Sequence, residues 1–268
     1  MKKFMSVVLA MLCVCTMLVS FTSCDKGSDW AKVEEQGYFT CGITVYEPMN
    51  YYEDGKLVGF DTEFAKAVAD YLGVEVKFVE IDWKSKYVEL DSGSIDLIWN
   101  GFTYGDEDGV SRTEYVDFTY SYLENRQCLV TKTDALETIK TANDLKGLRG
   151  VAEGGSSGES LAKTVTDEGK VTAFPTQAMA LMELVSGNAD FAVIDYQMAN
   201  SMVGKGDYSA LSINEALKPE AEVYAIGCRK GSDLTEKINE AIDALYADGT
   251  LARIAEKYDL TNDLKIGK

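Results

Sequence analysis

The sequence contains no histidine in 268 residues. This absence excludes Ser–His–Asp and Cys–His catalytic triads, histidine-ligated zinc or haem, and a histidine pH switch. Basic residues are also scarce: 26 Lys and Arg stand against 44 Asp and Glu, and the formal charge is −18. A surface of that sign repels phosphate backbones, which argues against nucleic acid as a partner.

Proline and paired cysteines are sparse as well. The chain has only three prolines, so few rigid linkers are expected. Of its six cysteines, three fall within the N-terminal segment described below, and Cys41, Cys128 and Cys228 remain. We interpret these three as buried hydrophobic residues, because their number is odd and no CxxC spacing occurs. The sequence leaves a single Cys128–Cys228 bridge open, and we expect neither a metal nor a cofactor.

Residues 1–23 are predicted to be a signal peptide. Lys2 and Lys3 precede the uncharged stretch Phe4 to Phe21, and two small residues follow it. The alternative is a transmembrane anchor, but 18 uncharged residues are short for a span and no basic cluster follows. Loss of this segment removes two positive charges and changes the formal charge from −18 to −20.

The signal segment ends in Thr22-Ser23-Cys24, which resembles a bacterial lipobox. The resemblance implies that Cys24 becomes the lipidated first residue of the mature chain. Two acyl chains suffice for stable membrane anchoring. We therefore expect an extracytoplasmic lipoprotein attached to the cell membrane, with residues 24–37 as the tether and the start of the mature chain.

The rest of the chain alternates predicted strands and helices, which is typical of an α/β fold with mostly parallel sheets. One predicted helix spans 61–72, with Asp61 as its cap and Phe64, Val68, Tyr71 and Leu72 on its apolar face. Another spans 176–186 and is predicted to turn Met179, Met182 and Val185 inward. The pattern restarts after residue 127, so two lobes are favoured over one long sheet. The length accommodates two lobes of ~100–120 residues each.

Polar residues follow several predicted strands, where open α/β sheets bind their ligands. Ser156 and Ser157 lie in a glycine-rich loop before a helix, a position that suits an anion or simply a flexible loop with a serine cap. Asp195 follows a buried strand and can either pair with an ammonium group or cap the next helix.

Two further groups belong to the same pattern. Asn100, Gly101 and Thr103 follow another buried strand, and Arg112 comes nine residues after Thr103. The planar guanidinium suits bidentate capture of a carboxylate, although a surface ion pair is the alternative. The aromatic residues near strand ends fit either a core or the wall of a ligand site: Tyr46, Tyr51 and Trp83. Together these groups could hold a zwitterion such as a free amino acid.

The order of segments resembles the family 3 extracellular solute-binding proteins, which deliver polar amino acids to ABC importers. The resemblance spans about residues 38–258 and includes these motifs: Gly42-Ile43-Thr44, Glu47-Pro48-Met49, Leu57-Val58-Gly59-Phe60-Asp61, Leu72-Gly73-Val74, Ser92-Gly93-Ser94-Ile95-Asp96, Val116-Asp117-Phe118-Thr119, Asp144-Leu145-Lys146-Gly147, Gly155-Ser156-Ser157-Gly158-Glu159, Gly187-Asn188-Ala189-Asp190 and Ala247-Asp248-Gly249-Thr250. Leu57 to Asp61 is the most specific of them.

The resemblance implies two α/β lobes joined by two crossover strands, of the type II periplasmic-binding-protein-like fold. Lobe 1 would comprise 38–126 and 223–268, and lobe 2 would comprise 127–222. A monomer would bind a free amino acid between them, close by a hinge motion taken over from that family, and deliver the ligand to an ABC transporter permease. The ligand contacts implied are Thr44, Tyr46, Trp83, Asn100, Gly101, Thr103, Arg112, Ser156, Ser157 and Asp195.

Within that set the resemblance assigns roles. Arg112 and Thr103 from lobe 1, with Ser156 and Ser157 from lobe 2, would bind the carboxylate. Asp195 and the edge at 100–101 would bind the α-ammonium group, and Trp83 and Tyr46 would form the walls.

Three positions depart from the family pattern. Thr44 stands where the family usually has aspartate, which affects one ammonium or side-chain contact. Met49 replaces an aromatic residue. Residues 105–108 look like an insertion ahead of Arg112.

Two other functions remain open. Some dehydratases share this fold, and such an enzyme would have to use carboxylates for acid–base chemistry in the absence of histidine. A ligand-sensing module that acts through a separate membrane partner is the other alternative, since no second long apolar run follows the first.

Overall fold

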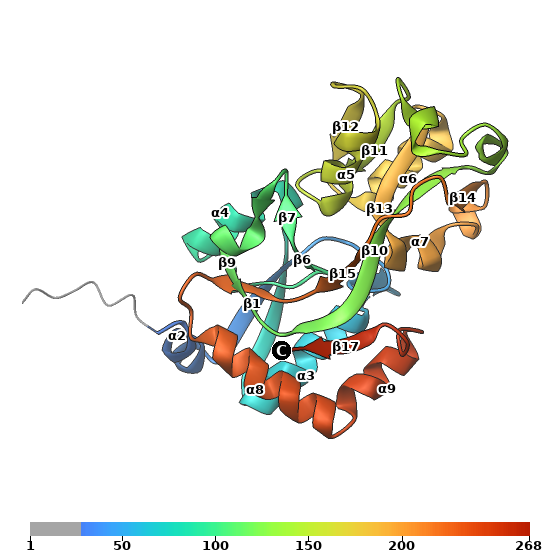
Figure 1. The fold of residues 1–268 in the computed structure, drawn as a ribbon. Helices are drawn as coiled ribbons and strands as arrows, with labels where there is room; N and C mark the ends of the chain where they lie inside the picture. Colours follow the sequence, from blue (N-terminus) through green and yellow to red (C-terminus); the bar gives the residue numbers. More distant parts are fainter. Residues whose placement is uncertain (1–27) are drawn as a thin grey trace, which may run out of the picture.

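The computed structural model describes residues 28–268, so the predicted signal peptide and residues 24–27, including Cys24, lie outside the described residues. The chain forms two lobes (Figure 1). In the first lobe, β1 pairs in parallel with β4 and β5, and β16 adds antiparallel to β5 and β9. The strands of this five-stranded sheet, in spatial order, are β4 (Glu75–Glu80), β1 (Tyr38–Ile43), β5 (Leu97–Ile98), β16 (Gly227–Arg229) and β9 (Val116–Phe118).

The second sheet extends from one lobe to the other through its longest strand, β10 (Ser121–Lys132). Residues 127–130 of β10 pair with β13, while residues 123–126 pair with β15. The curved path of β10 between the lobes is visible in Figure 1. The second lobe holds β11 to β14. The other strands of this sheet are β12 (Val171–Phe174), β11 (Gly150–Glu153), β13 (Phe191–Asp195), β14 (Leu211–Asn214), β15 (Ala221–Tyr224), β6 (Thr103–Tyr104) and β17 (Leu264–Gly267).

Helices cover the sheets of both lobes. Those of the first lobe are α2 (Asp29–Gln36), α3 (Phe60–Leu72), η1 (Trp83–Ser85), α4 (Lys86–Ser92), η2 (Arg112–Glu114), α8 (Leu234–Ala247) and α9 (Thr250–Lys257). Those of the second lobe are η3 (Thr133–Glu137), η4 (Ala142–Leu145), α5 (Ser157–Val165), α6 (Gln177–Ser186), α7 (Tyr196–Met202) and η5 (Gly206–Tyr208). Two small hairpins complete the first lobe: β2 (Tyr51–Glu53) with β3 (Lys56–Val58), and β7 (Asp106–Glu107) with β8 (Val110–Ser111). Between residues 28 and 268, no helix combines the length and apolarity that crossing a membrane requires.

Helix α3 begins differently from the sequence prediction. Gly59 occupies its N-cap position, and Asp61 lies in the first turn with its side chain fully buried. The carboxylate of Asp61 accepts hydrogen bonds from the Gly101 N–H (2.7 Å) and the Tyr122 hydroxyl (3.0 Å). These partners are 40 and 61 residues away along the chain, so local capping patterns could not identify them. Tyr71, which was predicted to lie on the apolar face of this helix, is 51% exposed.

Asp61 makes the stability of the fold depend on pH. Burial raises its pKa from 3.8 to about 7, and the hydrogen bonds from Gly101 and Tyr122 offset only part of the rise. Between those pH values the folded chain binds more protons at Asp61 than the unfolded chain does, so this group makes the free energy of unfolding fall as the pH rises. In Asp61→Asn, the free energy of unfolding measured with urea should therefore fall by about 2–4 kcal/mol less between pH 5 and 8 than it does in the wild-type protein. Parallel pH profiles for the two proteins would contradict this assignment.

The buried face of helix α6 differs in part from the one predicted: Val185 packs against the core as expected, but the two methionines do not turn inward. Met179 and Met182 are 50% and 43% exposed. The residues that turn inward are Gln177, Ala180, Leu181 and Leu184. Most positions of this helix are apolar. Because apolar residues occur on several sides of this helix, their 3.6-residue period does not identify the buried face.

The cysteine prediction is confirmed. Cys41, Cys128 and Cys228 are all buried free thiols, so the Cys128–Cys228 bridge left open by the sequence does not form. Burial raises the pKa of both Cys128 and Cys228 to about 12. All three thiols therefore behave as small hydrophobic residues.

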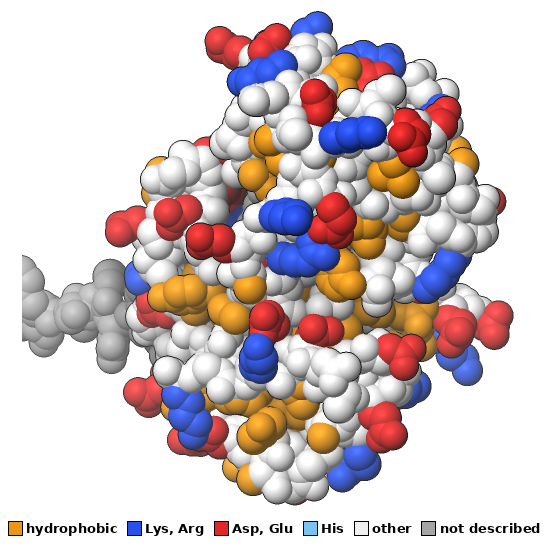
Figure 2. All heavy atoms as spheres, turned by 45° about the vertical axis from the view of Figure 1, so that its right-hand side comes forward, with side chains coloured by type: hydrophobic (Ala, Val, Ile, Leu, Met, Phe, Trp, Pro, Cys, Tyr) orange, Lys and Arg blue, Asp and Glu red, His pale blue; other side chains and the backbone are white. Residues whose placement is uncertain are grey.

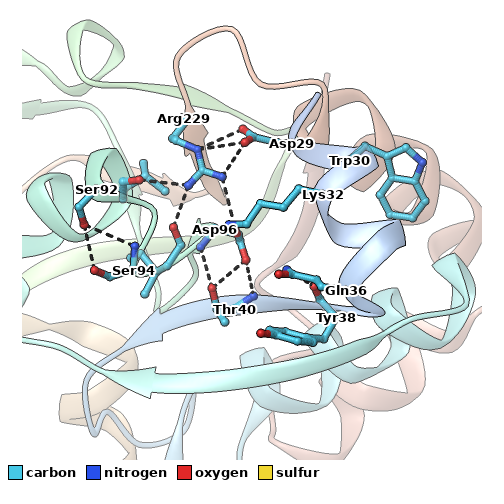
Figure 3. Close-up of polar contacts among 12 residues, drawn as sticks. Asp29, Trp30, Lys32, Gln36, Tyr38, Thr40, Ser92, Ser94, Asp96 and Arg229 are labelled. Atoms are coloured by element: carbon cyan, nitrogen blue, oxygen red, sulfur yellow. Dashed lines mark hydrogen bonds and ion pairs between the residues drawn. The ribbon is translucent and has the colours of Figure 1, made fainter. Parts of the chain in front are cut away.

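An ion-pair cluster fixes α2 to the first lobe (Figure 3). Arg229 pairs with Asp29 at the start of α2 (2.8 Å) and with Asp96 (3.2 Å). Asp96 also binds Lys32 of α2 (3.1 Å) and both the N–H and hydroxyl of Thr40 in β1. The beginning of the described chain is thus attached to the sheet of the first lobe.

Candidate functional site

Polar side chains from both lobes meet in the cleft at the ends of β5, β11 and β13. They surround a cavity of about 10 Å³, room for about one water molecule. An amino acid is far larger, so the lobes must separate to admit one. The residues that line the cavity are Trp83, Asn100, Gly101, Thr103, Arg112, Glu153, Ser156, Ser157, Gln177 and Asp195. Eight of these ten were singled out by the sequence, and Glu153 and Gln177 were not.

Arg112 lies in the cleft despite the inserted residues before it. The insertion folds into the β7–β8 hairpin, and the backbone N–H of Arg112 bonds to the Gly105 carbonyl (2.9 Å). Its guanidinium donates through Nη1 to the Thr103 carbonyl (2.8 Å) and through Nε to Glu107 (3.3 Å). The side chain is 1% exposed, and Nη2 is buried without a partner. Arg112 is therefore a buried cation with one donor group unused, not a surface ion pair.

Ser156 and Ser157 lie at the N-terminus of α5 and have different roles. The Ser156 hydroxyl accepts from the Glu159 N–H (3.0 Å) and donates to the Glu153 carbonyl (2.7 Å), so it caps the helix. The Ser157 hydroxyl is buried and has no partner. The positive end of the helix dipole favours an anion there. Ser157 thus presents a free donor from the second lobe.

Asp195 occupies the N-cap position of α7, yet its side chain makes no capping bond. The capping alternative raised by the sequence is therefore wrong. Its Oδ1 accepts from the side-chain amides of Asn125 and Gln127 (both 2.7 Å), and its Oδ2 accepts from Gln177. Burial raises the pKa of Asp195, and these amide hydrogen bonds oppose the rise.

Glu222 lies beside Asp195 and was not predicted from the sequence. The amides of Asn125 (2.6 Å) and Gln127 (2.8 Å) bond to Glu222 as well as to Asp195, and the Thr103 hydroxyl donates to it at 3.0 Å. Burial and the nearby charge of Asp195 raise the pKa of Glu222. The two strands that connect the lobes, β10 and β15, thus bring a second acid close to Asp195.

Glu153 is the third acid of the cleft. It ends β11, is 3% exposed, and has one buried carboxylate oxygen without a hydrogen-bond partner. Burial raises its pKa to about 8, and Asp195 adds to the rise. A charged residue at the end of an otherwise apolar strand, directly before the glycine-rich loop, was the signal available in the sequence.

Three more predicted contacts, like Ser156 and Thr103, have their polar groups engaged within the protein. The Asn100 carbonyl oxygen accepts from the N–H (3.0 Å) and hydroxyl (2.8 Å) of Thr44. The Tyr46 hydroxyl bonds to that of Tyr224 (2.6 Å), and the Tyr46 ring packs against Gly101. A Cβ at residue 101 would fall 2.6 Å from this ring, and its φ of +56° also favours glycine. Thr44 and Tyr46 therefore support the site from behind its lining.

Several contacts join the two lobes around the cavity. Lys86, which pairs with Glu107 of its own lobe (2.9 Å), donates to the Gly155 carbonyl of the second lobe (2.9 Å). At the tip of the β7–β8 hairpin, Asp108 pairs with Lys163 of α5 (3.1 Å). These contacts hold the lobes in a closed arrangement.

Charge on the outer surface is mixed rather than gathered over the cleft. Acidic and basic side chains are interspersed over both lobes on the face shown in Figure 2.

A larger groove of about 630 Å³ lies outside the cleft, on the first lobe near Tyr104 and Phe118. Its Asp117 is already bonded to Lys230 (2.6 Å) and to the Gly231 N–H (2.6 Å). The cleft is the better candidate, because its unpartnered polar groups are buried. Between residues 28 and 268, no cluster of acidic and cysteine side chains could hold a metal ion.

Comparison with known proteins adds independent information. The family described as "Bacterial extracellular solute-binding proteins, family 3" matches residues 39–261. The L-cystine-binding protein TcyJ of Escherichia coli (strain K12) is 34% identical over 232 residues, which are 85% of this chain and 84% of that protein.

Two solved structures have the same fold. An ABC uptake transporter substrate-binding protein from Streptococcus pneumoniae with bound histidine has a TM-score of 0.78 and 34% identity, over 87% of this chain and 96% of that one. The ancestral amino acid-binding protein AncCDT-1, a precursor of cyclohexadienyl dehydratase, has a TM-score of 0.77 and 29% identity, over 86% and 99%.

Proposed function

Because the chain belongs to family 3 of the bacterial extracellular solute-binding proteins, we propose that it is the amino-acid-binding component of an ABC importer. One observation carries the proposal: each lobe presents an unused buried donor to the same cavity. These donors are Arg112 Nη2 and the Ser157 hydroxyl. The acids Asp195 and Glu153 line that cavity too. Donors for a carboxylate beside acceptors for an ammonium group form a receptor for a zwitterion.

A ligand that contacts both lobes would couple its binding to closure of the lobes. A ligand shifts the open–closed equilibrium only through contacts that differ between the two states. A carboxylate bound by both Arg112 and Ser157 makes such contacts, because one residue comes from each lobe. Residues 38–126 with 223–268 would move against 127–222, and the paths of β10 and β15 between the sheets support this division.

The proposal includes membrane attachment. Cys24 would carry the lipid after removal of residues 1–23, the stretch up to residue 37 would form the tether and the start of the mature chain, and the protein would act as a monomer that docks on the permease. The attachment of α2 to the first lobe supports a tether that leaves from that lobe.

A ligand panel tests the binding function. We expect at least one of the twenty amino acids, at 100 times its Kd, to stabilise the fold by about 2.7 kcal/mol. That corresponds to a rise in Tm of roughly 5–10 °C for a chain of this size. Differential scanning fluorimetry at millimolar ligand measures the shift. No shift with any amino acid would refute an amino-acid receptor.

We further propose that the protein releases its ligand unchanged. The dehydratase alternative remains of interest, because AncCDT-1 is a precursor of such an enzyme and Glu153 could act there as a general acid. Incubation with prephenate or arogenate separates the two functions. Product formation that is lost in Glu153→Gln would establish the enzyme.

A further inference from the structure

One oxygen of the Glu153 carboxylate lacks a partner inside the protein. This atom, Oε1, is buried in the cleft without a hydrogen bond. A buried charge without a partner is costly, and a protein normally pairs or neutralises it. The side chain also lines the cavity where we propose that the ligand binds. The raised pKa leaves Glu153 largely protonated at neutral pH without a ligand, and a cation brought into the cavity would favour its charged form and pair with it.

The groups that face Glu153 do not neutralise it. Asp195 and Asp82 are acidic and raise its pKa. Lys86 and the Thr44 hydroxyl are the groups that lower it. Lys86, however, already bonds to Glu107 and to the Gly155 carbonyl.

A simple α-amino acid offers no group to Glu153. Its one ammonium group would face Asp195 and the neighbouring Glu222, and its one carboxylate would face Arg112. Glu153 would stay buried and unpaired in such a complex. A ligand with a second positive group could pair with it, and the Trp83 ring, which lines the same cavity, is suited to stacking on a cation.

We propose that Glu153 determines specificity by pairing with a cationic ligand side chain, so that the substrates are amino acids with a guanidinium or a second ammonium group. This inference rests on the proposed amino-acid-binding function. It adds to that function the class of side chain and the residue that selects it. Asp195 and Arg112 would recognise the α-carbon groups common to all amino acids, while Glu153 would distinguish among them.

Calorimetry with a matched pair of ligands tests the inference. L-Arginine and L-citrulline have nearly the same shape but differ in charge, and Glu153→Gln removes the acid with little change in size. We expect the wild-type protein to bind arginine at least 10-fold more tightly than citrulline. In Glu153→Gln that ratio should fall to near one, mainly through weaker binding of arginine.

The control is Glu168→Gln, because Glu168 is exposed after α5 and lies outside the cavity. It removes the same charge and should keep the wild-type ratio, and the Tm of all three proteins checks their folding. An arginine-to-citrulline ratio unchanged by Glu153→Gln would overturn the inference. So would selective binding of neutral amino acids by the wild-type protein, a result that leaves the proposed function intact. Absence of binding by all twenty amino acids would instead overturn the proposed function.

Discussion

Asp195→Asn should weaken ligand binding by at least about 30-fold, measured by calorimetry with the ligand found in the panel. The substitution removes the negative charge that would pair with the α-ammonium group, and loss of one partner of a buried charge pair typically costs about 2–5 kcal/mol. Asparagine is preferable to alanine, because alanine would leave the amides of Asn125, Gln127 and Gln177 without their acceptor.

Asp195→Asn should have little effect on the stability of the protein without ligand. Removal of the charge relieves the repulsion between Asp195 and Glu222, while one hydrogen bond to the amides is disturbed. These effects oppose each other, so the Tm without ligand should change by no more than a few degrees.

Asp190→Asn is a matched control for this change. Asp190 precedes the same strand, β13, but pairs with Arg149 (2.7 Å) on the surface. Its replacement should leave the affinity unchanged. An affinity loss below 10-fold in Asp195→Asn, with the control unaffected, would remove Asp195 from the site.

The sequence predicted residues at strand ends better than those on the connecting strands. Ser157 follows β11 and Asp195 ends β13, two strands that pair in parallel and bring their carboxyl ends together, whereas Asn100 follows β5 of the other sheet. The ligand-facing end of each strand therefore follows from local patterns, but the strand order does not. The same logic failed for Glu222, because its place beside Asp195 depends on β10, which pairs with β13 at one end and with β15 at the other.

Local patterns also could not assign partners to polar groups. Asp61 looks like a helix cap in the sequence, but its bonds reach Gly101 and Tyr122. Arg112 looked displaced by an insertion, yet the β7–β8 hairpin returns the chain so that Arg112 bonds to Gly105 and Thr103. Hydrogen bonds between distant residues decide both cases, and no period or spacing encodes them.

Arg112→Lys should reduce ligand affinity by about 10–100-fold. The guanidinium can bond to the Thr103 carbonyl and Glu107 while Nη2 stays free for a carboxylate. A lysine ammonium group is a point charge without the fork, so it cannot hold all three partners in this geometry. The lysine variant keeps the positive charge, and a loss of affinity therefore measures the geometry of the donors rather than the charge.

A carboxamide derivative of the ligand identifies which group Arg112 binds. The wild-type protein should prefer the amino acid over its α-carboxamide by a large factor, and Arg112→Lys should lose much of that preference because the loss falls on the carboxylate. Arg149→Lys is the control, since Arg149 is exposed and pairs with Asp190. If Arg112→Lys weakens both ligands equally, Arg112 acts by supporting the hairpin and Thr103, and the carboxylate must be held by Ser157 and the N-terminus of α5 instead.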